Sequence, residues 1–372
     1  MIHLILSLDY EIFGNGSGDV WRDMIEPTER LLSLCNRYGA KMSIMLEVGE
    51  YWAMQEAERN GSLRLDYSPS LEIKRQIQNA VKDGHDVQLH LHPWWIDATF
   101  ENNKWRLHPE YMKITDLPNG LGSETDLHSV IGTLWKGKKT LESMLRPVRD
   151  DYECLVYRAA MFWGQPSREL IEGLKKAGLV ADSSVVRGLH ETKPVLTDYR
   201  DAPSTAGYWW TNADDIAQAG PTGKHIIEFP VYSTMKPYIN NLKWTKLSVS
   251  LKRRSLERAN KNGFGMMEAR RSTEPMSHTL CKLGTLHPLK YDFCKLSARD
   301  MIRGLNRVIK FDSENENDFG TPLVMLGHSK DFWNDRNLEL FLCYVRKQCG
   351  GRACFAALGE LTKGILRGDT LC

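Results

Sequence analysis

Two carboxylates stand at the end of the apolar run that opens the chain. The stretch "HLILSLDYEIFG" contains Asp9 and Glu11, which are two residues apart. On a β-strand such residues point to the same face. Two acids on one face of an apolar strand are costly to bury unless they pair, bind a cation or face a cleft. The pair therefore indicates a cation site or a cleft. The alternative is that both acids lie just past the strand, in a solvated loop with Gly14 and Gly16.

A pair of histidines with the same spacing follows later, in "GHDVQLHLHPWW". His90 and His92 can present both imidazoles on one side of a strand end, where two neutral nitrogens converge on a divalent ion such as zinc. Single histidines are usually structural or exposed, but the pair is less easily explained in that way. Carboxylate and histidine ligands with an open place for water form a hydrolytic arrangement.

Three further residues stand at the ends of apolar runs. His328, in "PLVMLGHSKDF", directly follows a buried run and suits a general acid or base, although a lone histidine is more often structural. Arg158, in "VYRAAMFWG", falls where a strand should be buried, so it needs an acidic partner. Glu228, in "IIEFPVY", is interpreted as a structural acid or one that supports the site indirectly.

The elements that must position these residues alternate between strands and helices. Continuous apolar runs, typical of strands covered on both faces, predict strands at 2–8, 40–48, 85–92, 153–162, 179–186, 225–232 and 322–329. Helical patterns predict helices at 26–39, 69–84, 166–178, 298–311 and 337–348, the first two with Pro near the start and Gly at the end. The chain closes with "RACFAALGELT". Such alternation predicts a parallel sheet or barrel with its site at the C-terminal ends of the strands.

Length and composition limit the class of protein. The 372 residues fit one large α/β domain with insertions, or two domains, and we take 1–372 as a single domain. The net charge of +2 argues against a dedicated nucleic-acid binder. No window approaches the ~18–20 apolar residues of a membrane span. Because the start lacks signal-peptide features and no C-x-x-C pair occurs, we expect a cytoplasmic protein with reduced thiols.

The segment 233–287 breaks the alternation. It carries "KWTKLSVSLKRRSLERANKNGFGMMEARRS", in which basic residues exceed acidic ones. We expect an insertion or lid on the main domain. Such a charge run is usually a solvated helix face, and the alternative is contact with an anionic substrate, such as a phosphate-bearing sugar, or with a membrane surface.

The order of the motifs resembles the polysaccharide deacetylase superfamily, the NodB-homology or carbohydrate esterase family 4 fold. The resemblance runs from Leu4 to about Ile365 as a series of short motifs. These are "SLDYE", "GHDVQLHLHP", "YRAAMF" followed by "SRELIEGLKKAGLVADSS", "EFPV" and "LVMLGHS". The resemblance implies a distorted (β/α) barrel with an inserted basic segment, and hydrolysis of an N-acetyl group on a sugar with one divalent ion, most often zinc.

Carried over residue by residue, the resemblance makes Asp9 the base that activates the attacking water. Glu11, His90 and His92 would hold the metal through one carboxylate and two imidazoles. In the family's first motif the acids are adjacent, whereas Tyr10 separates them here. Asp9 and Glu11 can therefore exchange roles, or both can touch the metal.

The resemblance assigns the remaining site residues as well. His328 would protonate the leaving amine, and Arg158 would orient Asp9. The family spaces its two histidines four apart, and the residue four after His90 is Trp94. Either His92 is then the second imidazole ligand or the site is weakened, and Trp94 can instead form a sugar-stacking platform, with core packing as the alternative.

A cytoplasmic member would act on a precursor in surface-polysaccharide biosynthesis, such as a nucleotide-linked or lipid-linked sugar. The acyl group can be acetyl or another small group such as formyl. Two alternatives stay open at this point. One is a non-catalytic carbohydrate-binding protein on the same fold, and the other is a metal-dependent hydrolase of cyclic amides.

Overall fold

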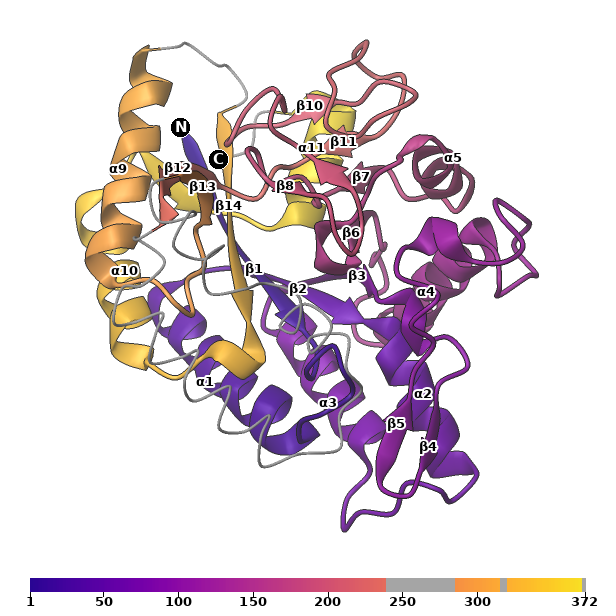
Figure 1. The fold of residues 1–372 in the computed structure, drawn as a ribbon. Coiled ribbons are helices and arrows are strands. Elements are labelled where there is room, and N and C mark those ends of the chain that lie inside the picture. The colour runs from indigo at the N-terminus through magenta and orange to yellow at the C-terminus, as the bar shows by residue number, and fades with distance from the viewer. Residues whose placement is uncertain (239–284, 315–319, 370–372) are drawn as a thin grey trace.

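The computed structural model describes residues 1–238, 285–314 and 320–369, and it shows a curled, mostly parallel sheet with helices packed outside it (Figure 1). The strand order is β10-β11-β7-β6-β3-β2-β1-β14, and β15 also pairs with β1. The strands are β1 Ile2–Tyr10, β2 Met42–Glu47, β3 Asp86–Leu91, β6 Val156–Ala159, β7 Ala181–Asp182, β10 Trp209–Trp210, β11 Ile227–Glu228, β14 Thr321–His328 and β15 Ala353–Phe355. Among the described strands of this sheet, only the β10–β11 pairing is antiparallel.

The expected barrel is present as an open, curled sheet. In the described part of the chain β10 and β14 are its two edges. Isolated contacts bring the edges together: Val231, just after β11, forms a parallel bridge with Val324, and the Gly207 N–H donates to the Pro322 carbonyl at 2.7 Å. A closed barrel needs a continuous ladder of hydrogen bonds between its edge strands. The expectation of a barrel is therefore corrected: the sheet is open, and its edges are joined by contacts between single residues.

The helices follow the end signals in the sequence. In α1, Glu26–Tyr38, Pro27 occupies the first turn and Gly39 ends the helix with φ 68°, as expected for a left-handed cap. In α3, Pro69–Lys82, the Ser68 hydroxyl accepts a hydrogen bond from the third residue of the helix. The other helices are α2 Val48–Arg59, α4 Val130–Leu145, α5 Arg168–Lys176, α9 Ala298–Glu314, α10 Asp335–Gln348 and α11 Leu358–Arg367.

Short elements complete the fold. Single turns of helix are η1 Trp21–Ile25, η2 Pro93–Trp95, η3 Ile114–Asp116, η4 Ala160–Phe162 and η6 Ser329–Asp331. Two-stranded ribbons pair β4 Thr99–Glu101 with β5 Lys104–Arg106, and β8 His190–Glu191 with β9 Thr197–Asp198. A third ribbon pairs β12 Ser233–Pro237 with β13 Leu286–Lys290.

The third ribbon bears on the expected insertion at 233–287. Its antiparallel strands are the two ends of that segment, so the ends lie side by side. Most of the segment lies outside the described residues, and its role as a lid stays a prediction.

Two expectations from composition can be compared with the structure. Within the described residues, no helix has the length and apolarity needed to span a bilayer. Cys354 is disulfide-bonded, whereas the other five described cysteines are free thiols. The expectation of reduced thiols is therefore wrong at Cys354.

The strand register gathers the predicted residues at one edge of the sheet. All nine residues of β1 are buried. Asp9 on β1 is the cross-strand partner of His328 on β14, and Glu47 on β2 is the partner of His90 on β3. His90 in turn is the partner of Arg158 on β6. All these positions are at the C-terminal ends of parallel strands, as expected.

Candidate metal centre and active site

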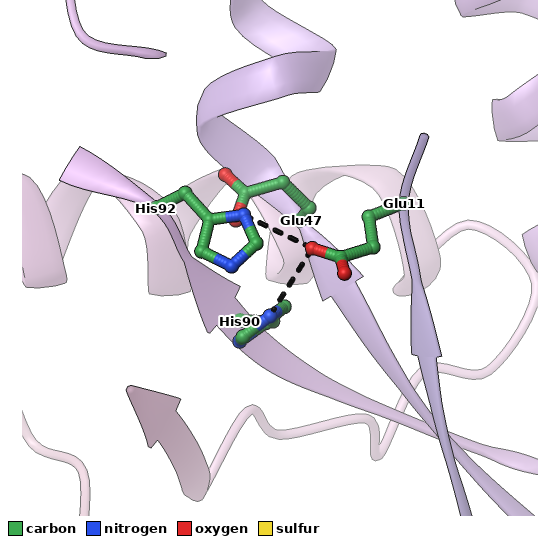
Figure 2. A group of neighbouring side chains, drawn as sticks. All are labelled: Glu11, Glu47, His90 and His92. Carbon is green, nitrogen blue, oxygen red and sulfur yellow. Dashed lines mark ion pairs between the residues drawn. The ribbon is translucent and has the colours of Figure 1, made fainter. Parts of the chain in front are cut away.

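Four buried side chains converge at the C-terminal ends of β1, β2 and β3: Glu11, Glu47, His90 and His92 (Figure 2). Each is at most 5% exposed, and one ligand atom from each lies within 4.8 Å of the others. Glu11 Oε2 is 3.5 Å from His90 Nε2 and 3.0 Å from His92 Nδ1. Glu47 Oε2 is 3.3 Å from the same His92 nitrogen.

The donor atoms of this cluster fit a divalent cation. Glu11 Oε2, Glu47 Oε2 and His92 Nδ1 are buried, and none has a hydrogen-bond partner. Unpaired buried polar atoms are rare because each loses its hydration without compensation. Two donors bound at about 2.1 Å on neighbouring places of one ion lie roughly 3.0–3.4 Å apart. The observed separations match that spacing, so a cation would satisfy all three atoms at once.

In two of the candidate ligands, His90 and Glu11, the side-chain atom that does not face the cluster contacts another group. His90 Nδ1 is 2.9 Å from the Arg158 carbonyl, so this nitrogen carries a proton and Nε2 is the ring nitrogen that faces the cluster. Glu11 Oε1 accepts a hydrogen bond from Lys330 Nζ at 2.6 Å, and Lys330 also donates to the Ile12 carbonyl at 2.7 Å. Lys330 is only 3% exposed. Both ligands are therefore oriented before any ion binds.

Glu47 was not predicted from the sequence. Its Oε1 accepts from the backbone N–H groups of Gly49 at 2.8 Å and Glu50 at 3.3 Å, which caps the N-terminus of α2. Its Oε2 remains for the cluster. The available signal was an acid at the end of the buried run "SIMLE", the same signal that identified Glu11. The expected strand 40–48 extended past Glu47 and hid the start of α2.

Burial and neighbouring charges shift the pKa values of the cluster residues in opposite directions. Burial alone would raise the pKa of Glu11, but the charges of His92 and Lys330 outweigh burial and hold that pKa well below its usual value. Burial would lower the pKa of His90, but the adjacent carboxylate of Glu11, together with those of Asp9 and Glu47, raises it to about 9. Burial raises the pKa of Glu47. Binding of a cation would therefore release protons.

Asp9 lies beside the cluster and is held by Arg158. Arg158 Nη1 donates to Asp9 Oδ1 at 2.6 Å, and Arg158 is fully buried. Arg158 is fixed by donating to the Ser183 carbonyl at 2.9 Å and hydroxyl at 3.0 Å. Burial would raise the pKa of Asp9, but the charges of Arg158, His90 and His328 outweigh it and lower that pKa. Asp9 is consequently ionised at neutral pH.

His328 faces the other oxygen of Asp9. Its Nε2 is 3.6 Å from Asp9 Oδ2, and its Nδ1 is 4.0 Å from carboxylate oxygens of both Asp292 and Asp331. Lys295 forms ion pairs with both of those acids, at 2.9 Å from Asp292. Burial, aided by the charge of Lys295, lowers the pKa of His328 to about 4. The imidazole is therefore neutral at neutral pH.

Trp94 is packed inside the site. It is 2% exposed, and its ring stacks on His92 with a centroid separation of 4.4 Å and an interplanar angle of 8°. Trp95 is also buried, at 1% exposed. This arrangement favours core packing over the sugar-stacking platform, because the face of Trp94 covers a candidate ligand.

The structure thus brings Asp9, Glu11, His90, His92, Arg158 and His328 together, and it gives Asp9, on β1, and Glu11, just past β1, different surroundings. Glu11 lies in the donor cluster, whereas Asp9 lies between Arg158 and His328. Glu228 is fully buried on β11, where burial and the neighbouring Asp182 raise its pKa well above the usual value. Its position agrees with the structural interpretation. Sequence reasoning missed Glu47, Lys330 and the acids behind His328.

No protein-family model and no curated protein matches the chain. Among solved structures, a putative polysaccharide deacetylase from Mycobacterium smegmatis is 11% identical with a TM-score of 0.44, covering 100% of this chain and 93% of that one. Puue allantoinase is 11% identical with a TM-score of 0.44, covering 100% and 91%. A probable polysaccharide deacetylase from Pseudomonas aeruginosa PAO1 is 12% identical with a TM-score of 0.44, covering 100% and 92%. These distant likenesses do not establish a family or an activity.

Proposed function

We propose that the protein is a metal-dependent hydrolase that removes an N-acetyl or other small N-acyl group from a sugar. The observation that carries the proposal is the adjacency of two arrangements. One is a buried set of carboxylate and imidazole donors that lack partners, and the other is the ionised Asp9 between Arg158 and His328. A donor cluster beside an ionised carboxylate and a neutral imidazole supports hydrolysis.

In this proposal Glu11, His90 and His92 hold one divalent ion, with Glu47 beside them. The ion supplies a Lewis acid that acidifies water and polarises the acyl oxygen. Zinc is the expectation from the sequence motifs. Lys330 and the Arg158 carbonyl keep the donor atoms of Glu11 and His90 turned toward the ion.

The proton path runs through two side chains. Asp9 is ionised and held by Arg158 through one oxygen, so its other oxygen is positioned to take a proton from the attacking water. His328 is neutral at rest and therefore cannot protonate the leaving nitrogen until it has gained a proton. In this proposal the proton passes from Asp9 Oδ2 to His328 Nε2 through one water, because their 3.6 Å separation is longer than a direct hydrogen bond. His328 then delivers the proton to the amine.

The backbone after Arg158 is the proposed oxyanion site. Met161 and Phe162 follow β6 with φ values of 52° and 68°, a left-handed region that side chains other than glycine rarely adopt. Such strain concentrates at functional loops, and it fits a turn whose N–H groups stabilise charge developing on the acyl oxygen.

The substrate class follows from the sequence motifs. They imply an acetamido sugar, and a cytoplasmic enzyme would meet it as a nucleotide-linked or lipid-linked precursor. The basic residues of 233–287 are compatible with such an anionic carrier.

The test is acyl release by metal-depleted protein and by the same protein reloaded with single divalent ions. Substrates would include free N-acetyl and N-formyl amino sugars, a nucleotide-linked acetamido sugar and a cyclic amide. We expect metal-dependent release from an acetamido sugar, and loss of turnover with retained metal in Asp9→Asn. Sugar binding without turnover at any metal loading would favour the binding-protein alternative, and turnover of the cyclic amide alone would favour the cyclic-amide hydrolase.

A further inference from the structure

Glu47 has the geometry of a metal ligand as well as a helix cap. One oxygen caps α2 by accepting from Gly49, and the other oxygen has no hydrogen-bond partner and points into the cluster (Figure 2). The side chain is 1% exposed. The cross-strand pairing of Glu47 with His90 fixes the carboxylate beside the imidazoles. Because the cap immobilises one oxygen, the free oxygen cannot turn away from the cluster without breaking the cap.

The charges around the cluster support the same assignment. Glu11 has a lysine partner in Lys330, and Asp9 has an arginine partner in Arg158. In the part of the chain that the structure describes, the only ion-pair partner of Glu47 is His92, at 3.3 Å. Glu47 therefore has neither a lysine nor an arginine partner among the described residues, and a metal ion would supply the positive charge that stabilises a buried carboxylate.

We propose that Glu47 is a fourth protein ligand of the ion, and that the working ion is one that takes five or six ligands, such as Mn²⁺, Fe²⁺ or Co²⁺, in place of four-coordinate zinc. The donor set would be two carboxylate oxygens and two imidazole nitrogens. The ligand assignment stands on the geometry, and the statement about the working ion rests on the proposed hydrolase function.

The second part of the proposal, the identity of the working ion, depends on the number of protein donors. Zinc sites with four protein ligands are usually closed and structural, whereas catalytic zinc keeps three protein ligands and an open place for water. Four protein donors would complete the tetrahedral shell of zinc and leave no place for water or the acyl oxygen. An ion with octahedral preference accepts the same four donors and retains two places.

The first measurement compares Glu47→Gln with a matched control, Glu50→Gln. Glu50 lies on the same helix, is also 1% exposed, and its oxygens lie 3.2 Å from the Ile12 N–H, outside the donor cluster. Gln at position 47 keeps an oxygen to cap α2. Metal-depleted full-length proteins are titrated with Mn²⁺, Co²⁺ and Zn²⁺ against a chromophoric chelator, and folding is checked by circular dichroism.

We expect Glu47→Gln to weaken Mn²⁺ and Co²⁺ binding by at least about 100-fold, because loss of a direct ligand should exceed the 10–100-fold cost of losing a supporting hydrogen bond. Glu50→Gln should bind these ions as the wild type does. If Glu47→Gln binds them like the wild type, Glu47 is a helix cap alone and this inference is overturned. Failure of the wild type to bind any divalent ion would instead overturn the proposed hydrolase function.

The second measurement needs no variant. X-ray absorption of the zinc-loaded wild type should show four nitrogen or oxygen neighbours, and the cobalt-loaded protein should show five or six. Zinc-loaded protein should also turn over substrate more slowly than cobalt-loaded protein. A zinc structure with three protein donors and a water, and with Glu47 outside the shell, would overturn the proposal.

Discussion

Replacement of Arg158 by methionine tests the electrostatic support of the proposed base. Arg158 is fully buried and Asp9 is 3% exposed, with 2.6 Å between Nη1 and Oδ1. Removing one partner of a buried ion pair leaves the other charge uncompensated and costs about 3–5 kcal/mol. We therefore expect Arg158→Met to lower the free energy of unfolding at pH 7 by an amount in that range.

The pH dependence of this destabilisation distinguishes an effect of the lost charge from an effect of lost packing. In the wild type the pKa of Asp9 is lowered, so the stability that the pair contributes is present above the unfolded pKa of Asp and is lost as the pH falls through the lowered value. In Arg158→Met the largest of the charges that oppose burial is removed and only the neighbouring imidazoles remain, so we expect the pKa of Asp9 to rise above its unfolded value. The folded variant then binds more protons than its unfolded chain does. Its loss of unfolding free energy relative to the wild type therefore becomes smaller as the pH falls.

The slope is at most about 1.4 kcal/mol per pH unit for one proton, or about 2.7 kcal/mol between pH 7 and pH 5. The assay is urea unfolding of metal-depleted wild type and Arg158→Met at both pH values. Arg158→Met in an Asp9→Asn background is the control, and there the pH dependence of the deficit should vanish. If Arg158→Met, with Asp9 present, loses the same unfolding free energy at pH 7 and at pH 5, the reasoning is refuted. The destabilisation would then come from packing and from the lost hydrogen bonds to Ser183.

Three further predictions concern the imidazoles and their surroundings. His92→Ala should lower metal occupancy, measured by elemental analysis after metal-replete purification, and unchanged occupancy would show that another imidazole is the ligand. Trp94→Ala should weaken metal binding about 10-fold or more, because the stacked ring orients His92; a raised KM for sugar with unchanged metal affinity would restore the stacking-platform interpretation. The His328 ring protons should titrate by NMR with a midpoint near the pKa of about 4 in the metal-depleted protein, and an ordinary midpoint near 6.5 would contradict the burial that keeps this imidazole neutral.

Much of the local structure follows from short-range signals. The apolar runs predicted the strands β1, β2, β3 and β14, and Pro and Gly predicted the ends of α1 and α3, because strand burial and helix capping are local properties. The i, i+2 spacing predicted common faces for Asp9 with Glu11 and for His90 with His92; both histidines lie in the donor cluster, whereas of the two acids only Glu11 does. Helix α2 was missed because it begins directly after β2, with Glu47 as its cap.

The sequence by itself determined that acids and imidazoles occur at the C-terminal ends of strands, since that depends only on residue types and periodicity. It left open which of Asp9 and Glu11 belongs with the histidines. The strand order decided this, because the side chains gathered around each acid come from β2, β3, β6 and η6, elements far apart in the chain. Lys330 turns one oxygen of Glu11 away and leaves the other for the cluster, while Arg158 holds Asp9 apart. Such partners depend on contacts across the sheet, which no local pattern encodes.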